Sequence, residues 1–163
     1  MKKTLELLSN FLVSISNSLL FIAMIGMTLV LGANIFLRFV FNQPISWANE
    51  LSRFLYIYIV LLGTAVAYKE DGHAKIIFVR DAVSYTYKVI FDVIHFAAII
   101  FLSVLLVILG IKHVITMWRV HGAVLTFLSM GIVYISVPFS FFCLFIFAIS
   151  KFIKEKNRAE ETS

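Results

Sequence analysis

The residues of this sequence that could do chemistry are four histidines and one cysteine. They are His73, His95, His113, His121 and Cys143. Catalysis or metal binding needs several polar groups that converge on one point. These residues are widely separated, and no HExxH, CxxC, glycine-rich phosphate loop or Ser/His/Asp arrangement can be read. Cys143 lies among phenylalanines and is predicted to be a small buried hydrophobe. We therefore expect no catalytic residue, no cofactor and no metal site in this chain.

Asp92 is the acid that lies deepest in a long apolar stretch, and a charge inside a membrane segment suggests a function by default. It follows Lys88 by four residues and precedes His95 by three, so the three side chains can share one helix face. One interpretation is a proton relay. The other, which we favour, is that Asp92 lies at the inner membrane interface and pairs with Lys88 or a neighbouring helix.

His95 could also ligate haem, as in a four-helix membrane cytochrome. Such a site needs paired histidines on facing helices well inside the bilayer. In this sequence His113 and His121 fall near the outer interface, and His73 falls in the inner connection. The spacing therefore does not favour haem.

The elements that must position these residues follow from an apolar composition. Hydrophobic residues make up 61% of the 163 residues and charged residues 14%, and the mean hydropathy is +0.99. A soluble domain has roughly 45–50% apolar and about 25% charged residues, so the surplus must face lipid. The net charge of +5 comes from basic residues set between apolar runs, without the continuous patch that a nucleic-acid partner needs. The sequence predicts an all-α integral membrane protein and excludes a soluble enzyme.

Four stretches are long and apolar enough to cross a bilayer, which takes about 20 residues of helix. We expect four transmembrane helices within a single membrane domain of residues 1–163, at 11–37, 48–68, 89–111 and 122–150. The connection 69–88 has apolar residues at helical spacing. It forms either a short interfacial helix on the inner membrane surface or an early start of the third span.

Lysine and arginine in the flanking segments predict the orientation of these spans. The two termini and the connection 69–88 together hold ten of them, and the two opposite connections hold four. Because basic residues accumulate on the cytoplasmic side, both termini are expected to be cytoplasmic.

The segment 38–53 is the most distinctive part of the chain. Trp47 suits the level of the lipid headgroups, and an arginine such as Arg38 can extend toward them. Glu50 and Arg53 are three residues apart and can pair on one helix face. An ordinary membrane anchor would show the same features.

Pro138 interrupts the fourth apolar stretch. It has no N–H group, so the carbonyl of Tyr134 loses its helical partner and the helix can kink there. With no acidic residue in this span, we interpret the kink as a packing bend rather than an ion site.

These residues resemble the small membrane subunit of tripartite ATP-independent periplasmic (TRAP) transporters, the Q-type or DctQ-like family. The family pattern is Arg-aromatic-x-Phe, a turn, Trp-x-x-Glu-x-x-Arg, then a span that ends in Gly-x-x-x-Ala before a basic residue and Gly-His. Here it reads Arg38, Phe39, Phe41, Trp47, Glu50, Arg53, Gly63, Ala67, Lys69, Gly72 and His73, and a later Tyr-x-x-x-Pro reads Tyr134 and Pro138. The resemblance covers roughly residues 30–145. One departure is Asn49-Glu50, where the family often has two acids.

The resemblance implies a scaffold subunit of a sodium-coupled secondary transporter for organic acids, of the sialic acid or C4-dicarboxylate type, in the bacterial inner membrane. Its partners would be a large multi-span subunit, in which the sodium coupling is expected, a periplasmic solute-binding protein, and membrane lipids. The candidate interface residues are Arg38, Trp47, Glu50, Arg53, Lys69, His73, Asp92, Tyr134 and Pro138. The alternatives are a membrane cytochrome subunit or a stand-alone four-helix exporter. Such an exporter generally needs an acid deep in its first helix, and residues 7–37 contain none.

The predicted orientation can be tested with reporter fusions at Ser163 and near Gln43. We expect a reporter that is active only in the periplasm to be silent at Ser163 and active near Gln43. Periplasmic activity at Ser163 would contradict the topology.

Overall fold

Helices account for nearly all of the chain that the computed structural model describes, residues 2–70 and 85–161. They are α1 (Lys2–Phe41), α2 (Ala48–Glu70), α4 (Tyr85–Met117), α5 (Met130–Tyr134) and α6 (Ser136–Glu161). Four segments are long and apolar enough to cross a membrane: Leu5–Phe41, Ala48–Glu70, Val93–Met117 and Met130–Ile153. This confirms the prediction of an all-α chain with four membrane-spanning helices. The expected interfacial helix falls mainly on residues 71–84, which lie outside the described part.

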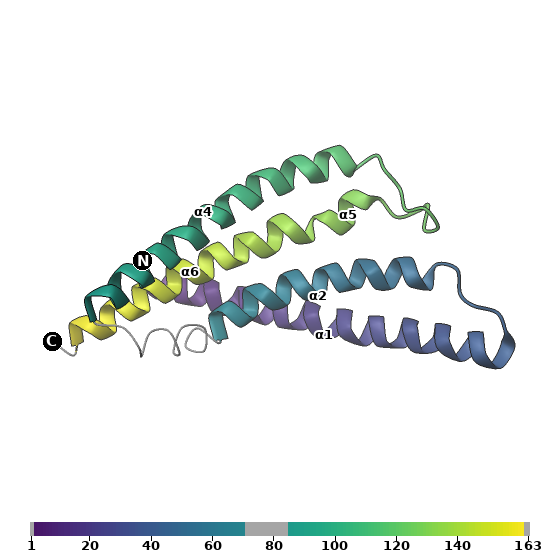
Figure 1. Cartoon of the computed structure of the whole chain (residues 1–163), viewed down its shortest axis with the longest axis horizontal. Coiled ribbons are helices and arrows are strands. Elements are labelled where there is room, and N and C mark those ends of the chain that lie inside the picture. Colours follow the sequence, from purple (N-terminus) through teal and green to yellow (C-terminus); the bar gives the residue numbers. More distant parts are fainter. Residues whose placement is uncertain (1, 71–84, 162–163) are drawn as a thin grey trace.

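The helices form two antiparallel pairs, α1 with α2 and α4 with α5 and α6 (Figure 1). The pairs lie against each other at the end of the molecule where both termini lie, which we call the terminal end. They diverge toward the opposite end, which we call the loop end because it holds the loops 42–47 and 118–129. An even number of spans requires both termini to be on one side, and the fold satisfies this.

The larger buried cluster lies where the pairs meet and is formed by α1, α2 and α6. Its members are Leu12, Ala65, Tyr68, Cys143, Leu144, Ile146, Phe147 and Ala148. Phe147 is fully buried, and so is Cys143, as predicted. Alanines and the cysteine let the helix backbones approach closely, which is how helices pack in a membrane.

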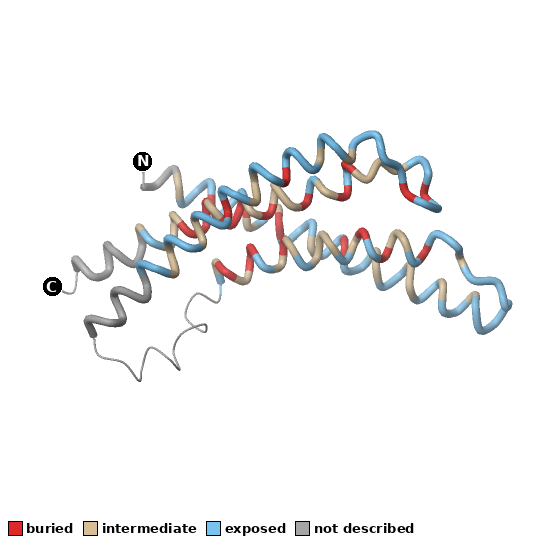
Figure 2. The backbone as a smooth tube through the Cα atoms, turned by 45° about the horizontal axis from the view of Figure 1, so that its top comes forward, coloured by how far each residue is buried: buried red, intermediate tan, exposed pale blue. Residues whose placement is uncertain are grey.

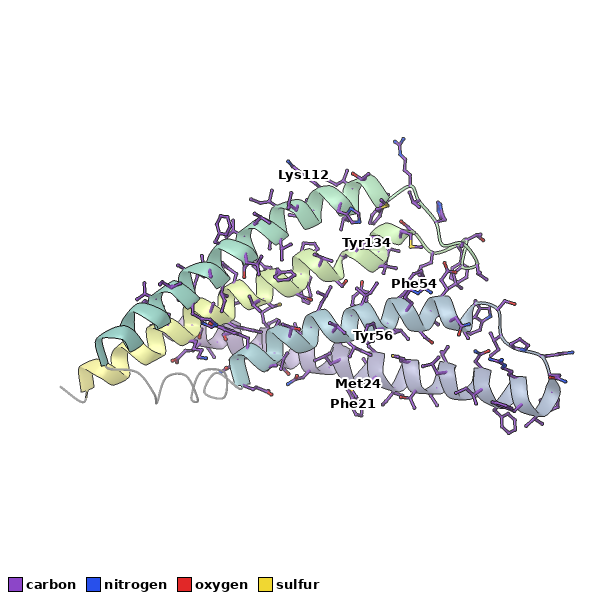
Figure 3. The ribbon with its side chains drawn as sticks, in the orientation of Figure 1. Phe21, Met24, Phe54, Tyr56, Lys112 and Tyr134 are labelled. Atoms are coloured by element: carbon purple, nitrogen blue, oxygen red, sulfur yellow. The ribbon has the colours of Figure 1, made fainter. Side chains whose placement is uncertain are left out.

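Large apolar side chains cover the outer faces of the two pairs. Phe21 is 66% exposed and Met24 is 57% exposed, and both point away from the bundle (Figure 3). On α4 the exposed side chains include Phe101 and Ile115. Figure 2 shows that exposed residues continue along most of α1 and α4. A surface this apolar must be covered by lipid or by another membrane protein.

The fourth span begins later than expected and is divided in two. Residues 118–129 form a loop, and α5 starts at Met130 because Ser129 caps it with a side-chain oxygen that accepts from the Gly131 amide at 3.1 Å. The helix breaks at Ile135, three residues before Pro138. The proline ring cannot fit against the carbonyl four residues earlier in a regular helix, which explains the break. The first and third helices extend beyond the expected 11–37 and 89–111 at both ends.

Pro138 packs directly against α4 at Gly110. A Cβ on Gly110 would lie 3.0 Å from the Pro138 Cδ and 3.2 Å from the Pro138 nitrogen. A side chain at this buried position would force the proline or its helix to shift, so the glycine favours the close approach. The contact supports the interpretation of the kink as a packing bend.

Replacing Gly110 by leucine should therefore push α4 away from α6. We expect Gly110→Leu to lower the free energy of unfolding by about 1–3 kcal/mol, the usual range for overpacking. Gly32→Leu is the matched control, because a Cβ on Gly32 meets nothing within 4 Å. Thermal unfolding in detergent, followed by circular dichroism, measures both. Equal stability of the two variants would contradict the close contact.

Candidate functional site

The start of α2 meets the loop 118–129 through the carboxylate of Glu50. One oxygen accepts a hydrogen bond from the Ala123 amide at 2.7 Å. The other accepts from the Val124 amide at 2.9 Å and from the Leu125 amide at 2.8 Å. Consecutive backbone N–H groups that point to one place form a site for an anion, and hydrogen bonds to a charged group are stronger than neutral ones. We call this arrangement the Glu50–loop contact.

Gly122 makes room for this contact. A Cβ there would lie 2.8 Å from the carbonyl oxygen of Leu125 and 3.0 Å from a carboxylate oxygen of Glu50. The Gly122 amide itself donates to the Leu128 carbonyl at 3.1 Å. Any side chain at this position would have to displace the loop or the carboxylate.

The base of the loop is closed by short-range hydrogen bonds. The Met130 amide donates to the Val120 carbonyl at 2.8 Å, and the Ser129 hydroxyl donates to the Trp118 carbonyl at 2.7 Å. Trp118 also lies on Gly131, where a Cβ would be only 2.7 Å from its Cε3 atom. The loop is therefore a defined structure that presents its amides to Glu50.

Close to the carboxylate, α2, the loop and α5 share a small apolar cluster. Phe54, Leu125 and Val133 are its buried members. A second polar link follows on α2, where the Tyr58 hydroxyl donates to the Ile132 carbonyl at 2.6 Å. Eight residues separate Glu50 from Tyr58, about 12 Å along the helix. These contacts hold the diverging pairs together near the loop end, which is where Figure 3 places Phe54.

A similar contact fixes the loop 42–47 between α1 and α2. The Asn34 side chain accepts from the Ile45 amide at 2.8 Å. Asn42 has φ of 55°, a left-handed conformation that asparagine tolerates, and it ends α1. Both loops at this end are thus held by polar side chains that extend from helices.

The predicted interface residues of the segment 38–53 divide into two groups. Arg38, Trp47 and Arg53 are exposed at the loop end, where they can meet headgroups or a partner. Glu50 is half-buried and is held by backbone amides of the loop 118–129, contacts that a Glu50–Arg53 pairing does not anticipate. Their proposed role at an interface remains a prediction.

The other predicted residues lie along the bundle. Lys69 donates to the Asn10 side chain at 2.9 Å and stands 5.3 Å from the centre of the Phe147 ring. The Tyr134 ring meets the imidazole of His113 edge-on, with 4.5 Å between the two ring centres. His73 is outside the described residues. Asp92 lies in α4, in which the described side chains begin at Val93, so its proposed pairing remains a prediction.

The three partners of Glu50 carried little sequence signal, because the amides of residues 123–125 are backbone groups that no residue type marks. Gly122, Gly110 and the capping residue Ser129 are residues that the sequence itself shows. Ser129 before an apolar run is a helix-start signal, and it could have moved the expected start of the fourth span. Within the described residues, no group of three or more His, Cys, Asp or Glu side chains could hold a metal ion.

The sequence matches the family model of tripartite ATP-independent periplasmic transporters, DctQ component, over residues 27–157. It is 41% identical over 44 residues to the sialic acid TRAP transporter small permease protein SiaQ of Vibrio cholerae. The matched segment covers 27% of this chain and 25% of that relative. It is 39% identical over 62 residues to the sialic acid TRAP transporter permease protein SiaT of Haemophilus influenzae. That matched segment covers 38% of this chain and 10% of the relative. The matched segments thus span a tenth to a quarter of these relatives' lengths.

The Glu50–loop contact predicts slow exchange of three backbone amides. In Glu50→Gln the carboxylate charge is lost, so the amides of residues 123–125 should exchange with deuterium about tenfold faster or more, since hydrogen bonds to charged groups contribute more than neutral ones. Glu70→Gln makes the same change at the exposed far end of α2 and should leave these amides unaffected. Unchanged exchange in Glu50→Gln would show that the carboxylate does not hold the loop.

Proposed function

The chain belongs to the DctQ component family of tripartite ATP-independent periplasmic transporters, and we propose that it is the scaffold for a large permease that transports an organic acid. The family match over residues 27–157 is the observation that carries this proposal. Members of the family are transporter subunits, so we propose a role in transport rather than in catalysis.

The buried polar side chains support a scaffold rather than a carrier. Among the described residues they are all serines: Ser9, Ser16, Ser52, Ser103, Ser136 and Ser140. Organic acids are bound in secondary transporters near the middle of the membrane, by broken helices whose N-termini point at the anion. The one break in a described span is at Ile135, where it is explained by Pro138 and its packing on Gly110. We therefore place the substrate site in the partner.

The large partner is supported by the relative SiaT. That permease is a much longer chain, of which the matched segment is 10%. A segment like this one is thus part of a large permease in that protein, and we infer that here the two parts are separate chains that assemble. The exposed apolar faces of α1 and α4 offer surfaces for assembly, with lipid on the remainder.

The substrate, the coupling ion and the location belong to the same proposal. The names of SiaQ and SiaT point to sialic acid, and the family pattern also admits C4-dicarboxylates. We place the sodium coupling in the large subunit and the capture of the acid in a periplasmic binding protein. The ten-to-four distribution of basic residues supports cytoplasmic termini in a bacterial inner membrane.

A transport assay tests the proposal. Liposomes that contain only this chain should show no sodium-driven uptake of sialic acid or a C4-dicarboxylate, because the buried polar groups among its described residues are serine hydroxyls, with no buried cation to pair with an organic anion. Liposomes that also contain the large subunit, with binding protein and substrate outside, are the positive control. Uptake by this chain alone would overturn the scaffold role.

A further inference from the structure

The loop 118–129 joins two membrane-spanning segments and presents apolar side chains outward. Phe127 is 82% exposed, and Trp118 and Val124 are each about half exposed. The loop holds no acidic residue, and Arg119 is its one residue that is charged at pH 7 with histidine neutral. Large apolar side chains gathered on a surface mark a place that a partner covers. Water alone is therefore a poor surrounding for this loop.

The backbone amides near the middle of the loop are paired within the protein. The Gly122 amide donates to the Leu128 carbonyl, and the next three amides donate to the Glu50 carboxylate. The Leu128 amide in turn donates to the Leu125 carbonyl at 3.0 Å. A loop in water can leave such groups to the solvent, whereas backbone groups that enter a membrane need protein partners. This pairing favours lipid over water around the loop.

The position of Glu50 on α2 gives the depth of the loop. Nineteen residues separate Glu50 from Lys69, which is about 28 Å of helix and close to the roughly 30 Å hydrocarbon thickness of a bilayer. Charges are costly inside the hydrocarbon, so the two residues suit its two boundaries. The loop, which Glu50 holds through hydrogen bonds, then lies at the boundary between acyl chains and headgroups.

The first helix extends farther outward than the loop does (Figure 1). A Cβ on Gly26 would lie 3.6 Å from the Leu55 side chain of the antiparallel α2, so Glu50 is level with about residue 31 of α1. From there to Phe41 the helix rises about 15 Å, which is more than the headgroup layer on one side of a bilayer. The loop is thus not the outermost part of the chain at this end.

We propose that the loop 118–129 is embedded in the membrane surface, where lipid acyl chains cover Val124 and Phe127. Trp118 suits the headgroup level, and the long side chain of Arg119 can extend to the lipid phosphates. A protein partner would form hydrogen bonds across its interface, but the amides near the middle of the loop are already used within the chain. The inference does not depend on the proposed transport role.

Thiol labelling of the full chain in liposomes, without any partner, tests the proposal. Phe127→Cys should react with a membrane-impermeant maleimide about tenfold more slowly than Gln43→Cys, because the reactive thiolate is disfavoured in apolar surroundings and the reagent stays in water. Gln43 is the matched control, since it is exposed in the other loop at the same end. Both positions therefore face the same side, whatever the orientation of the chain in the liposome. The wild type, whose Cys143 is buried, gives the background.

A second variant and two controls make the result decisive. Val124→Cys probes the same surface and should react as slowly as Phe127→Cys. All three variants should react equally fast after denaturation in SDS, which shows that the thiols are intact. A circular dichroism spectrum that matches the wild type shows that each variant is folded.

Two results would overturn the proposal. Labelling of Phe127→Cys and Val124→Cys as fast as Gln43→Cys would place the loop in water. Protection of these two positions that arises only when the large permease is added to the liposomes would identify a protein interface instead of a lipid surface.

Discussion

The Glu50 carboxylate determines how the two helix pairs are held together where they diverge. Helices that separate toward one side of a membrane leave loop amides without helical partners, and such groups need an acceptor. Glu50 supplies one for three consecutive amides, and Gly122 leaves the space that the carboxylate needs. The apolar cluster of Phe54, Leu125 and Val133 lies beneath, so the polar contact also fixes the packing of α2 against α5.

The rest of the bundle is only partly able to enclose itself. Its larger core is confined to the terminal end, where Phe147 and Cys143 are fully buried, while α1 and α4 expose long rows of large apolar side chains. In lipid this surface has no tendency to collapse, so helix contacts depend on small residues and on specific polar links. Gly110 packed against Pro138 is a small-residue contact, and the hydrogen bond from the Tyr58 hydroxyl to the Ile132 carbonyl is a specific polar link. A chain built in this way suits a subunit whose outer faces are completed by lipid and a larger protein.

The sequence predicted those features that depend on local composition. Span length and hydropathy indicate four helices, and Pro138 indicates the break that the structure has at Ile135. The Trp47, Glu50 and Arg53 pattern indicates the family to which the chain belongs. The loop 118–129 was only partly predicted, because residues 122–129 were assigned to the fourth span, whose expected start contains the apolar residues Val124 and Phe127. The partners of Glu50 were not predicted, since they are backbone groups 73 to 75 residues away. Hydropathy cannot locate contacts of this kind.

The central claim is that Glu50 holds the loop 118–129 in place at the loop end. Its most direct link to the proposed scaffold role is tested by co-purification with the proposed large permease. Glu50→Gln and Glu70→Gln would each be expressed with the large subunit and the binding protein, isolated in mild detergent, and assayed for uptake in liposomes. If the proposed assembly needs the loop that Glu50 holds, Glu50→Gln loses both assembly and uptake, while Glu70→Gln retains them. Full assembly and uptake with Glu50→Gln would contradict this link and leave Glu50 as a residue that orders only its own loop.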